Sequence, residues 1–413
     1  MRAELTESRK KLPVRSLAAL NAANFFQAEM VGVVLPVLSA YLREAHWRYD
    51  QIGLVTAIAG LGTLLLQSPA GWMTDHFSCR RLLFLAMCLV TGACFGLIPV
   101  LPKTFAWTGL LLFLSGAAQS FFGPLLAALA LALAGHQMLN RTMGSNQAWN
   151  HTGNIVAAAA AIGVVQLFGL TAIFYSVAAC SLLAAASVLW IREDDLDERV
   201  ARGLTKDEAK EVSWLELFRD RRILYLFISI FLFHLANAPI LPTVALYVKK
   251  LGGSNDLMTA TVLTAQSVMV PVALLSGRLC DRWGRKATMA VAFWVLPARI
   301  FSYSLVANPF GIVGLQCLDG IGAGIYGVAV VAFSADLTRG KGHFNTLMGL
   351  FATALAIGGV AGPLLSGSLV QHLGFRATFY IFAGLALVGA GVFTGKVPET
   401  RREQLAPVLQ AVV

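Results

Sequence analysis

Apolar segments of membrane-spanning length recur along the whole chain, separated by short polar stretches. A helix rises about 1.5 Å per residue and a bilayer core is about 30 Å thick, so about 20 apolar residues make one crossing. The pattern predicts an all-α polytopic membrane protein with twelve transmembrane helices, near residues 16–39, 51–71, 82–101, 107–134, 146–168, 171–191, 223–247, 258–277, 288–307, 311–334, 346–370 and 377–395.

The longest polar stretch, residues 192–222, mixes acidic and basic residues densely. It predicts a cytoplasmic linker between an N-terminal six-helix bundle, residues 1–191, and a C-terminal six-helix bundle with a short cytoplasmic tail, residues 223–413. The two halves are therefore expected to be separate bundles in one chain.

The two halves also repeat each other at an offset of 205 or 206 positions. A nearly constant offset over many positions indicates parallel halves related by an axis along the membrane normal, with a binding site between them near the membrane middle. The coinciding landmarks include Tyr41 with Tyr247, Gly71 with Gly277, Asp75 with Asp281, Asn140 with Asn345, and Phe174-Tyr175 with Phe379-Tyr380.

Composition supports a membrane environment. Apolar residues make up 57% of the chain and charged residues only 13%, about half the share usual in soluble domains, and the mean hydropathy is +0.69. The net charge of +10 would suit nucleic acid binding, but 25 of the 32 Lys and Arg fall in segments that alternate helices place on one side. This asymmetry indicates topology, with both termini cytoplasmic, and we expect no nucleic acid partner.

Two inter-helix loops carry the same small and charged residues. The loop after the eighth predicted helix contains Gly277, Asp281, Arg282, Gly284, Arg285 and Lys286. The loop after the second keeps Gly71, Asp75, Arg80 and Arg81. Glycine lets two helices approach closely, and an aspartate with nearby arginines forms a charge cluster that can break and re-form when the halves move. A simple positive-inside anchor is the alternative.

This loop pattern, repeated in both halves, resembles the major facilitator superfamily of transporters in its bacterial type. Pro398-Glu399-Thr400 after the last helix is similar to a C-terminal signature of that family. The resemblance covers the whole chain and implies the twelve-helix fold of two pseudo-symmetric halves. The glycine-proline pattern of proton-driven exporters is missing from residues 146–168, whereas a similar spacing occurs at residues 358–367, so the direction of transport stays open.

Four ionisable residues fall inside predicted helices, where charge is costly and usually functional: Glu29, His234, Arg299 and Asp319. The helical rise puts all four at a similar depth. Arg299 and Asp319 come from consecutive helices, so we expect an ion pair that is either a static tie or a switch sensitive to protons or anions. Glu29 is a candidate proton carrier that points at a neighbouring helix.

His234 lies one turn before Asn237, in a helix that Pro239 and Pro242 should kink. This spacing predicts a polar face on the seventh helix. His234 is then either a proton-coupling group or a core histidine bonded to a backbone carbonyl.

An amide stripe runs along the fifth predicted helix. Asn146, Asn150 and Asn154 are spaced four apart on one face, with Trp149 alongside. The stripe is either a bond between helices or a wall of the substrate path, and we favour the wall. Further candidates for the lining are Asn24, Gln119, Asn237, Tyr303 and Tyr326.

Several patterns do not carry enzyme or cofactor chemistry. Gly322, Gly324 and Gly327 have dinucleotide-binding spacing but lie inside an apolar segment with no preceding strand, so helix packing explains them better. The six cysteines show no metal-site or secreted spacing. Without a P-loop or a hydrolytic triad, we expect no enzyme activity, cofactor or metal, and a transport energy that comes from a gradient.

We therefore expect a monomeric secondary active transporter in the bacterial inner membrane that moves a small organic solute by alternating access, with proton-coupled efflux favoured. The first alternative is an uptake symporter or uniporter for a small solute, with Arg299 holding an anionic substrate. The second is a non-transporting solute sensor on the same fold. The sequence leaves the substrate, the coupling ion and the stoichiometry open.

Overall fold

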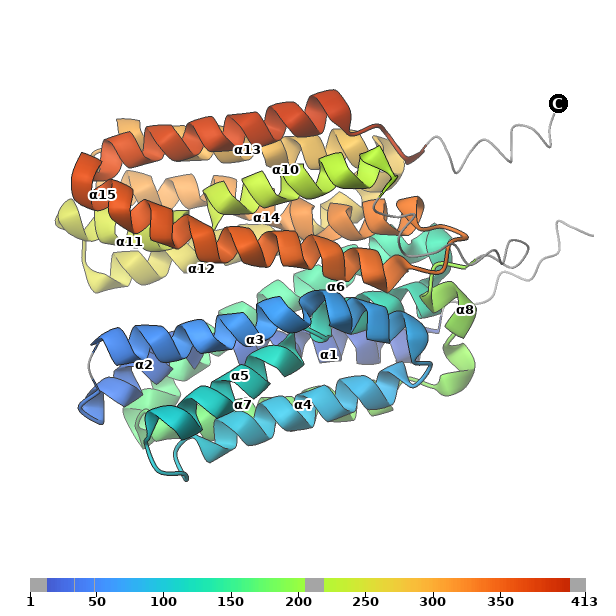
Figure 1. The fold of residues 1–413 in the computed structure, drawn as a ribbon, viewed down its shortest axis with the longest axis horizontal. Helices are drawn as coiled ribbons and strands as arrows, with labels where there is room; N and C mark the ends of the chain where they lie inside the picture. Colours follow the sequence, from blue (N-terminus) through green and yellow to red (C-terminus); the bar gives the residue numbers. More distant parts are fainter. Residues whose placement is uncertain (1–12, 33, 48, 205–218, 402–413) are drawn as a thin grey trace, which may run out of the picture.

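The computed structural model of the chain describes residues 13–32, 34–47, 49–204 and 219–401 (Figure 1). The middle of the predicted linker, residues 205–218, and the outermost tails lie outside the described residues. Within those ranges every regular element is a helix: α1 (Val14–Gly32), α2 (Val34–Glu44), α3 (Tyr49–His76), α4 (Arg80–Leu97), α5 (Phe105–Gln119), α6 (Phe122–Phe168), α7 (Thr171–Leu189), η2 (Glu193–Asp195), α8 (Glu198–Ala201), α10 (Arg221–Asn237), α11 (Ile240–Lys250), α12 (Asn255–Arg282), α13 (Arg285–Leu305), α14 (Pro309–Leu337) and α15 (Phe344–Lys396).

Nine segments of the described chain are long and apolar enough to cross a membrane. Two of them, Phe105–Phe168 and Phe344–Lys396, contain 64 and 53 residues, more than two crossings require. Helices α1 and α2 add a further apolar stretch that is not among the nine. This inventory is consistent with the twelve predicted passages.

The two longest helices each contain one glycine with a left-handed backbone. Gly374 within α15 has φ 79°, and Figure 1 shows α15 running out and back as two rods. Gly135 within α6 has φ 63°. The Ala132 carbonyl nearby accepts from the Asp197 amide at 3.4 Å, so this turn lies beside the linker. Both predicted helix pairs, the fourth with the fifth and the eleventh with the twelfth, are therefore joined through a glycine turn.

Proline and local geometry interrupt two of the predicted helices. Helix α10 ends at Asn237 and α11 begins at Ile240, and this break at Pro239 confirms the predicted interruption of the seventh helix. The predicted segment 107–134 is divided, because α5 ends at Gln119 and α6 begins at Phe122. The sequence pattern had indicated one continuous helix there.

Helices α1–α7 gather in one bundle and α10–α15 in the other (Figure 1). The bundles meet where α15 packs on α3 and where α12 packs on α6. Helix α8 lies at one end of the assembly, beyond the ends of the long helices (Figure 1). We call this the linker end.

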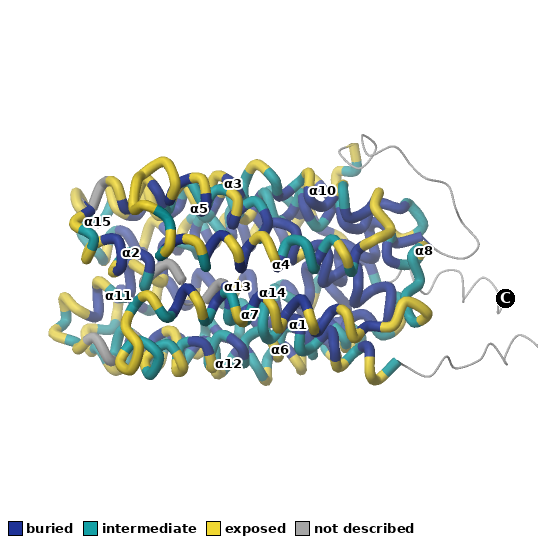
Figure 2. Tube along the Cα trace, turned by 90° about the horizontal axis from the view of Figure 1, so that it is seen from below, coloured by how far each residue is buried: buried dark blue, intermediate teal, exposed yellow. Residues whose placement is uncertain are grey.

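The outer surface of the bundles is apolar. On α4, Leu82, Leu89 and Leu97 are exposed, whereas Phe84 and Cys88 on the opposite side are fully buried. Figure 2 shows the same alternation of exposed and buried positions along α4. A helix that is apolar on both its inner and its outer face suits a lipid environment rather than water.

Candidate functional site

Asp75, at the end of α3, caps the first turn of α15 in the other bundle. Its Oδ1 accepts from the backbone N and the Nδ2 of Asn345, at 3.1 and 2.8 Å. Its Oδ2 accepts from the backbone N and Oγ1 of Thr346, at 2.6 and 2.7 Å. The first amides of a helix lack partners within the helix, so a buried carboxylate satisfies them and complements the helix dipole.

The repeat places a similar contact at the second loop, again between the two bundles. Asn140 donates through Nδ2 to Oδ1 of Asp281 at 2.6 Å, and the Arg141 Nε lies 3.6 Å from Oδ2. Asp281 is the repeat equivalent of Asp75 in α3, and Asn140 is the repeat equivalent of Asn345. We call these two contacts the Asp75 clasp and the Asp281 clasp.

One glycine at each clasp lets its two helices approach closely. A Cβ added to Gly71 would overlap the carbonyl oxygen of Asn345, and one added to Gly277 would overlap that of Asn140. The predicted role of these glycines in close helix approach thus has a geometric basis at both positions. Asn140 and Asn345 appeared in the sequence only as repeat landmarks, and their function in the clasps was not anticipated.

The basic residues of the first loop bind the linker. Arg80 is buried and forms an ion pair with Glu198 of α8. Arg81 donates to Glu193 at 2.7 Å and to the Leu189 carbonyl at 3.1 Å. The linker thereby docks on the loop between α3 and α4.

The second loop binds the C-terminal segment instead. Gly284 has φ 103°, which glycine adopts without strain, and the amides of Arg285 and Lys286 both donate to the Glu399 carboxylate at 2.9 and 3.0 Å. The Arg282 carbonyl accepts from Arg401 at 2.5 Å. Glu399, noted in the sequence only as part of a signature, therefore orders this loop.

Asp336 of α14 was missed by the sequence reasoning. It pairs with the Arg285 Nε at 2.8 Å and accepts from the Thr400 Oγ1 at 2.8 Å. The sequence signal was available, because an aspartate near the end of an apolar helix is itself unusual.

The predicted ion pair between Arg299 of α13 and Asp319 of α14 is present. Arg299 is 3% exposed, and its Nη2 also donates to the Asn237 Oδ1 at 2.5 Å. The group thus ties α13, α14 and α10 together. Its cavity, about 10 Å³ and lined by Phe233 among others, has room for a water but not for an organic solute. Whether the group ties helices or acts as a switch stays a prediction.

Glu29 of α1 lies apart from that group, in the other bundle. Its Oε2 accepts from the Cys180 Sγ of α7 at 3.0 Å. Glu29 also lines a cavity of about 70 Å³ whose other walls are mostly small apolar residues, among them Ala157, Ala161 and Val177. The structure thus places one carboxylate in an apolar recess between α1, α6 and α7, as expected for a residue that points at neighbouring helices.

His234 is bonded within its own helix. Its Nδ1 lies 3.2 Å from the Ile230 carbonyl, and its ring packs edge-on against Tyr326 at 4.9 Å. Tyr326 in turn stacks on Phe233. Tyr303 is fully buried one turn after Arg299, with its ring against Phe379. These contacts match the alternative of a core histidine; the proton-coupling role stays a prediction.

The amide stripe faces α1 at its centre. Asn150 donates to the Asn24 carbonyl at 3.3 Å and to the Gln27 Oε1 at 3.0 Å, whereas the Asn154 side chain, within the part of the chain that the structure describes, donates only back to Asn150. Asn146 is 1% exposed, with its Oδ1 unbonded within the described chain. Asn150 therefore bonds two helices.

The remaining lining candidates have local partners or are exposed. Asn24 donates to the Leu20 carbonyl of its own helix at 2.9 Å, and Gln119 donates to Ser115 at 2.8 Å. Trp149 is 47% exposed, with its ring near Phe25.

Two further bonds join the bundles away from the clasps. Ser68 and Thr353 lie 2.8 Å apart through their hydroxyl oxygens, and the His151 Nδ1 lies 2.9 Å from the Gln266 Oε1. His151 stands beside the asparagine stripe, so the cross-bundle surface includes that helix. Across the described residues, no group of three His, Cys, Asp or Glu could hold a metal ion.

Several known proteins are similar to this chain in sequence or in fold. The profile of the Major Facilitator Superfamily matches residues 17–296 and 227–411. An uncharacterized MFS-type transporter of Mycobacterium tuberculosis is 35% identical over 396 residues, 94% of each chain. The multi-drug resistance efflux pump PmrA of Streptococcus pneumoniae is 24% identical over 379 residues, 86% of this chain and 90% of that one. Sugar efflux transporter A of Dickeya chrysanthemi is 28% identical over 403 residues, 93% and 96%.

The solved structure of the human organic anion transporter MFSD10 (TETRAN) superposes with a TM-score of 0.67 at 15% identity, covering 92% of this chain and 99% of that one. At this identity the likeness concerns the fold alone. The family profile and the 35% identical relative each extend over nearly the whole chain. The chain therefore belongs to the Major Facilitator Superfamily, as a multi-pass membrane transporter and not an enzyme.

Proposed function

We propose that the protein is a proton-coupled exporter of small amphipathic organic solutes, working by alternating access in the bacterial inner membrane. In this proposal the halves are residues 1–191 and 223–413, joined by a linker at 192–222, and the linker end with both termini is cytoplasmic because basic residues concentrate there. The protein acts as a monomer.

The observation that carries alternating access is the pair of clasps. Both join opposite halves at the same end, and the repeat offset relates them. Each consists of hydrogen bonds between groups that water can solvate once the halves part, so the closed end can open at a modest free-energy cost. In this proposal the chain is closed toward the cytoplasm.

Export is supported by two relatives, whose names describe efflux of drugs and of sugars. The apolar and aromatic character of the helices favours amphipathic solutes over sugars as the substrate. Uptake of an anion by Arg299 is less favoured, because Asp319 and Asn237 already occupy this guanidinium in a cavity that admits only water.

Glu29 is our candidate for the proton carrier. It is a carboxylate with a thiol as its partner rather than a cation, in an apolar recess with room for water. Asp319 is a weaker candidate, because protonation of its carboxylate would leave Arg299 buried without a counter-charge.

The test is substrate-triggered proton movement in proteoliposomes, screened over pools of amphipathic solutes and sugars, for wild type, Glu29→Gln and the matched neighbour Cys180→Ala. We expect one pool to move protons in wild type and Cys180→Ala, and Glu29→Gln to bind solute without moving protons. Everted and right-side-out vesicles separate export from uptake. Solute flux with no proton signal in any variant would refute coupling, and binding without flux would indicate the sensor alternative.

A further inference from the structure

The linker touches both bundles at the Asp75 clasp. The carbonyl of Ala201, at the end of α8, accepts from the Nδ2 of Asn345 at 3.1 Å. The same Nδ2 donates to Asp75 at 2.8 Å. One amide group thus joins the first bundle, the second bundle and the linker.

Two more backbone bonds extend this contact to the second bundle. The Gly203 carbonyl accepts from the Gly340 amide at 2.7 Å, and the Arg202 carbonyl accepts from the Phe344 amide at 3.3 Å. Phe344 is the first residue of α15, so the linker carbonyl satisfies an amide at the same helix start that Asp75 caps.

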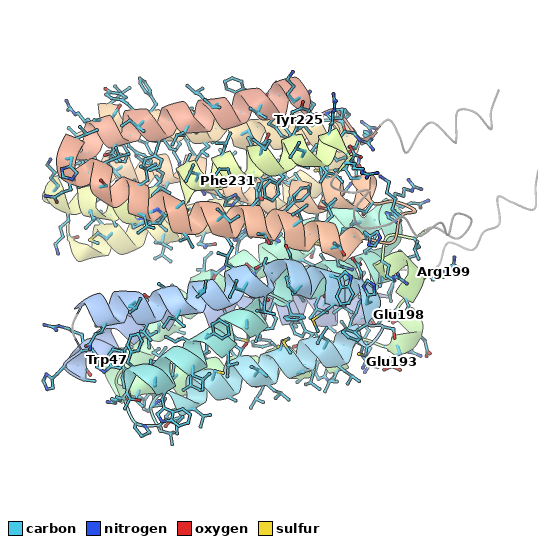
Figure 3. The ribbon with its side chains drawn as sticks, in the orientation of Figure 1. Trp47, Glu193, Glu198, Arg199, Tyr225 and Phe231 are labelled. Carbon is cyan, nitrogen blue, oxygen red and sulfur yellow. The ribbon has the colours of Figure 1, made fainter. Side chains whose placement is uncertain are left out.

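On the other side, Glu198 holds the linker to the first bundle. Arg80 is 2% exposed and Glu198 is its ion-pair partner, while two of the Arg80 guanidinium nitrogens, Nε and Nη2, have no hydrogen-bond partner in the described chain. Asp75 is a second negative charge near Arg80, and Arg202 is a nearby positive one. Figure 3 shows Glu198 and Glu193 together at the linker end.

The C-terminal segment, which follows the last helix of the second bundle as the linker follows that of the first, is different. Glu399, Thr400 and Arg401 bond only to residues of the second bundle within the described chain. Among the described residues, the two segments therefore differ: the linker contacts both bundles, whereas the C-terminal segment contacts one. Packing of the linker against the first bundle does not explain its hydrogen bonds to the second bundle.

We propose that residues 198–204 of the linker form a state-dependent lock, which docks on both bundles only when the linker end is closed and must release one bundle before that end opens. Opening would separate Asn345 from Asp75, and Ala201 cannot stay bonded to Asn345 while Glu198 stays paired with Arg80. The stability of the docked linker then sets the balance between the two states of the transporter, independently of any substrate.

The test measures the distance between the bundles at the linker end in purified full-length protein in nanodiscs. Ser78→Cys and Trp283→Cys place spin labels at exposed, repeat-equivalent positions of the two loops, in a chain whose exposed cysteines are replaced by Cys79→Ser and Cys317→Ser. The variant is Glu198→Gln. Its matched control is Glu193→Gln, a linker carboxylate outside the lock that also pairs with the first bundle, through Arg81. The Glu193 side chain is 84% exposed, so this surface ion pair contributes little to stability.

We expect Glu198→Gln to raise the ratio of long to short distances by about tenfold, the scale for losing a hydrogen bond between charged groups, and Glu193→Gln to leave it unchanged.

Gly203→Ala tests the lock without changing charge, because this residue has φ 84° and an added Cβ would lie 3.2 Å from the Phe344 Cβ. It should shift the ratio in the same direction. An unchanged distribution in both Glu198→Gln and Gly203→Ala, or an equal shift in Glu193→Gln, would overturn the proposal. No substrate is present, so the result does not depend on the proposed export.

Discussion

The Oδ1 of Asp75 accepts two hydrogen bonds from Asn345, a residue 270 positions later in the chain and in the other bundle. A carboxylate at the end of one helix thus caps the start of another across the boundary that a transporter must open. The repeat supplies a weaker version at Asp281, which is 31% exposed at its side chain and accepts from one amide.

Because the Asp75 clasp has more hydrogen bonds than the Asp281 clasp, Asp75→Ala should favour the open state more strongly. Removing a helix cap costs about 1 kcal/mol, so the open state at the linker end should gain about fivefold in population. Asp281→Ala should produce a smaller shift, because fewer bonds are lost. The spin-label distances described above measure both variants. An equal or larger effect of Asp281→Ala would show that the number of hydrogen bonds does not determine how much each clasp stabilises the closed state.

Gly71→Ala should slow transport strongly, because its new Cβ would overlap the backbone carbonyl of Asn345, which cannot rotate away. Overpacking of this kind costs about 1–3 kcal/mol and acts only on the closed state. We expect the initial rate of solute flux to fall by about tenfold or more. Gly60→Ala is the control on the same helix, since a Cβ there meets nothing within 4 Å. Normal flux in Gly71→Ala would contradict close approach at this site.

The outcome at the clasps shows what a single sequence could predict. The helices, the offset between halves and the loop glycines were predicted, because hydropathy and spacing are local or periodic properties. The partners of Asp75 were not, because an asparagine at a helix start carries no signal of which distant carboxylate it meets. The division of the segment 107–134 at residues 120 and 121 was also missed, since the apolar pattern continues through it.

The partners of buried charged side chains were predicted more successfully than the partners of buried amide side chains. Arg299 and Asp319 are 20 positions apart on consecutive helices, and a membrane-buried arginine requires a counter-charge, so the sequence restricted the choice of partner. Asn237 completes the group from α10, and no rule of spacing connects it to Arg299. An amide has many acceptable partners, and only the packing decides among them.

The Arg299–Asp319 pair predicts unequal effects of single and double substitution. Asp319→Asn leaves a guanidinium that is 3% exposed without a counter-charge, which costs about 3 kcal/mol or more. The midpoint of thermal unfolding in detergent should fall strongly for this variant. Arg299→Met combined with Asp319→Leu should recover most of that loss, because no charge stays buried. If the double variant is stable but inactive in transport, the pair is a switch; if it is stable and active, the pair is a static tie.

Asn150 and Asn154 separate the two interpretations of the amide stripe, because they lie one turn apart on the same helix but have different partners. Asn150 bonds to Gln27 and to the Asn24 carbonyl of α1, whereas the Asn154 side chain donates to Asn150 and to no other described residue. Inter-helix side-chain bonds in membranes contribute about 0.6 kcal/mol, so Asn150→Ala should lower the thermal unfolding midpoint slightly and Asn154→Ala should not. If the stripe is also a wall of the substrate path, Asn154→Ala should change the relative flux of competing solutes while the midpoint stays at the wild-type value. A lowered midpoint with unchanged solute preference in both variants would reduce the stripe to a bond between helices.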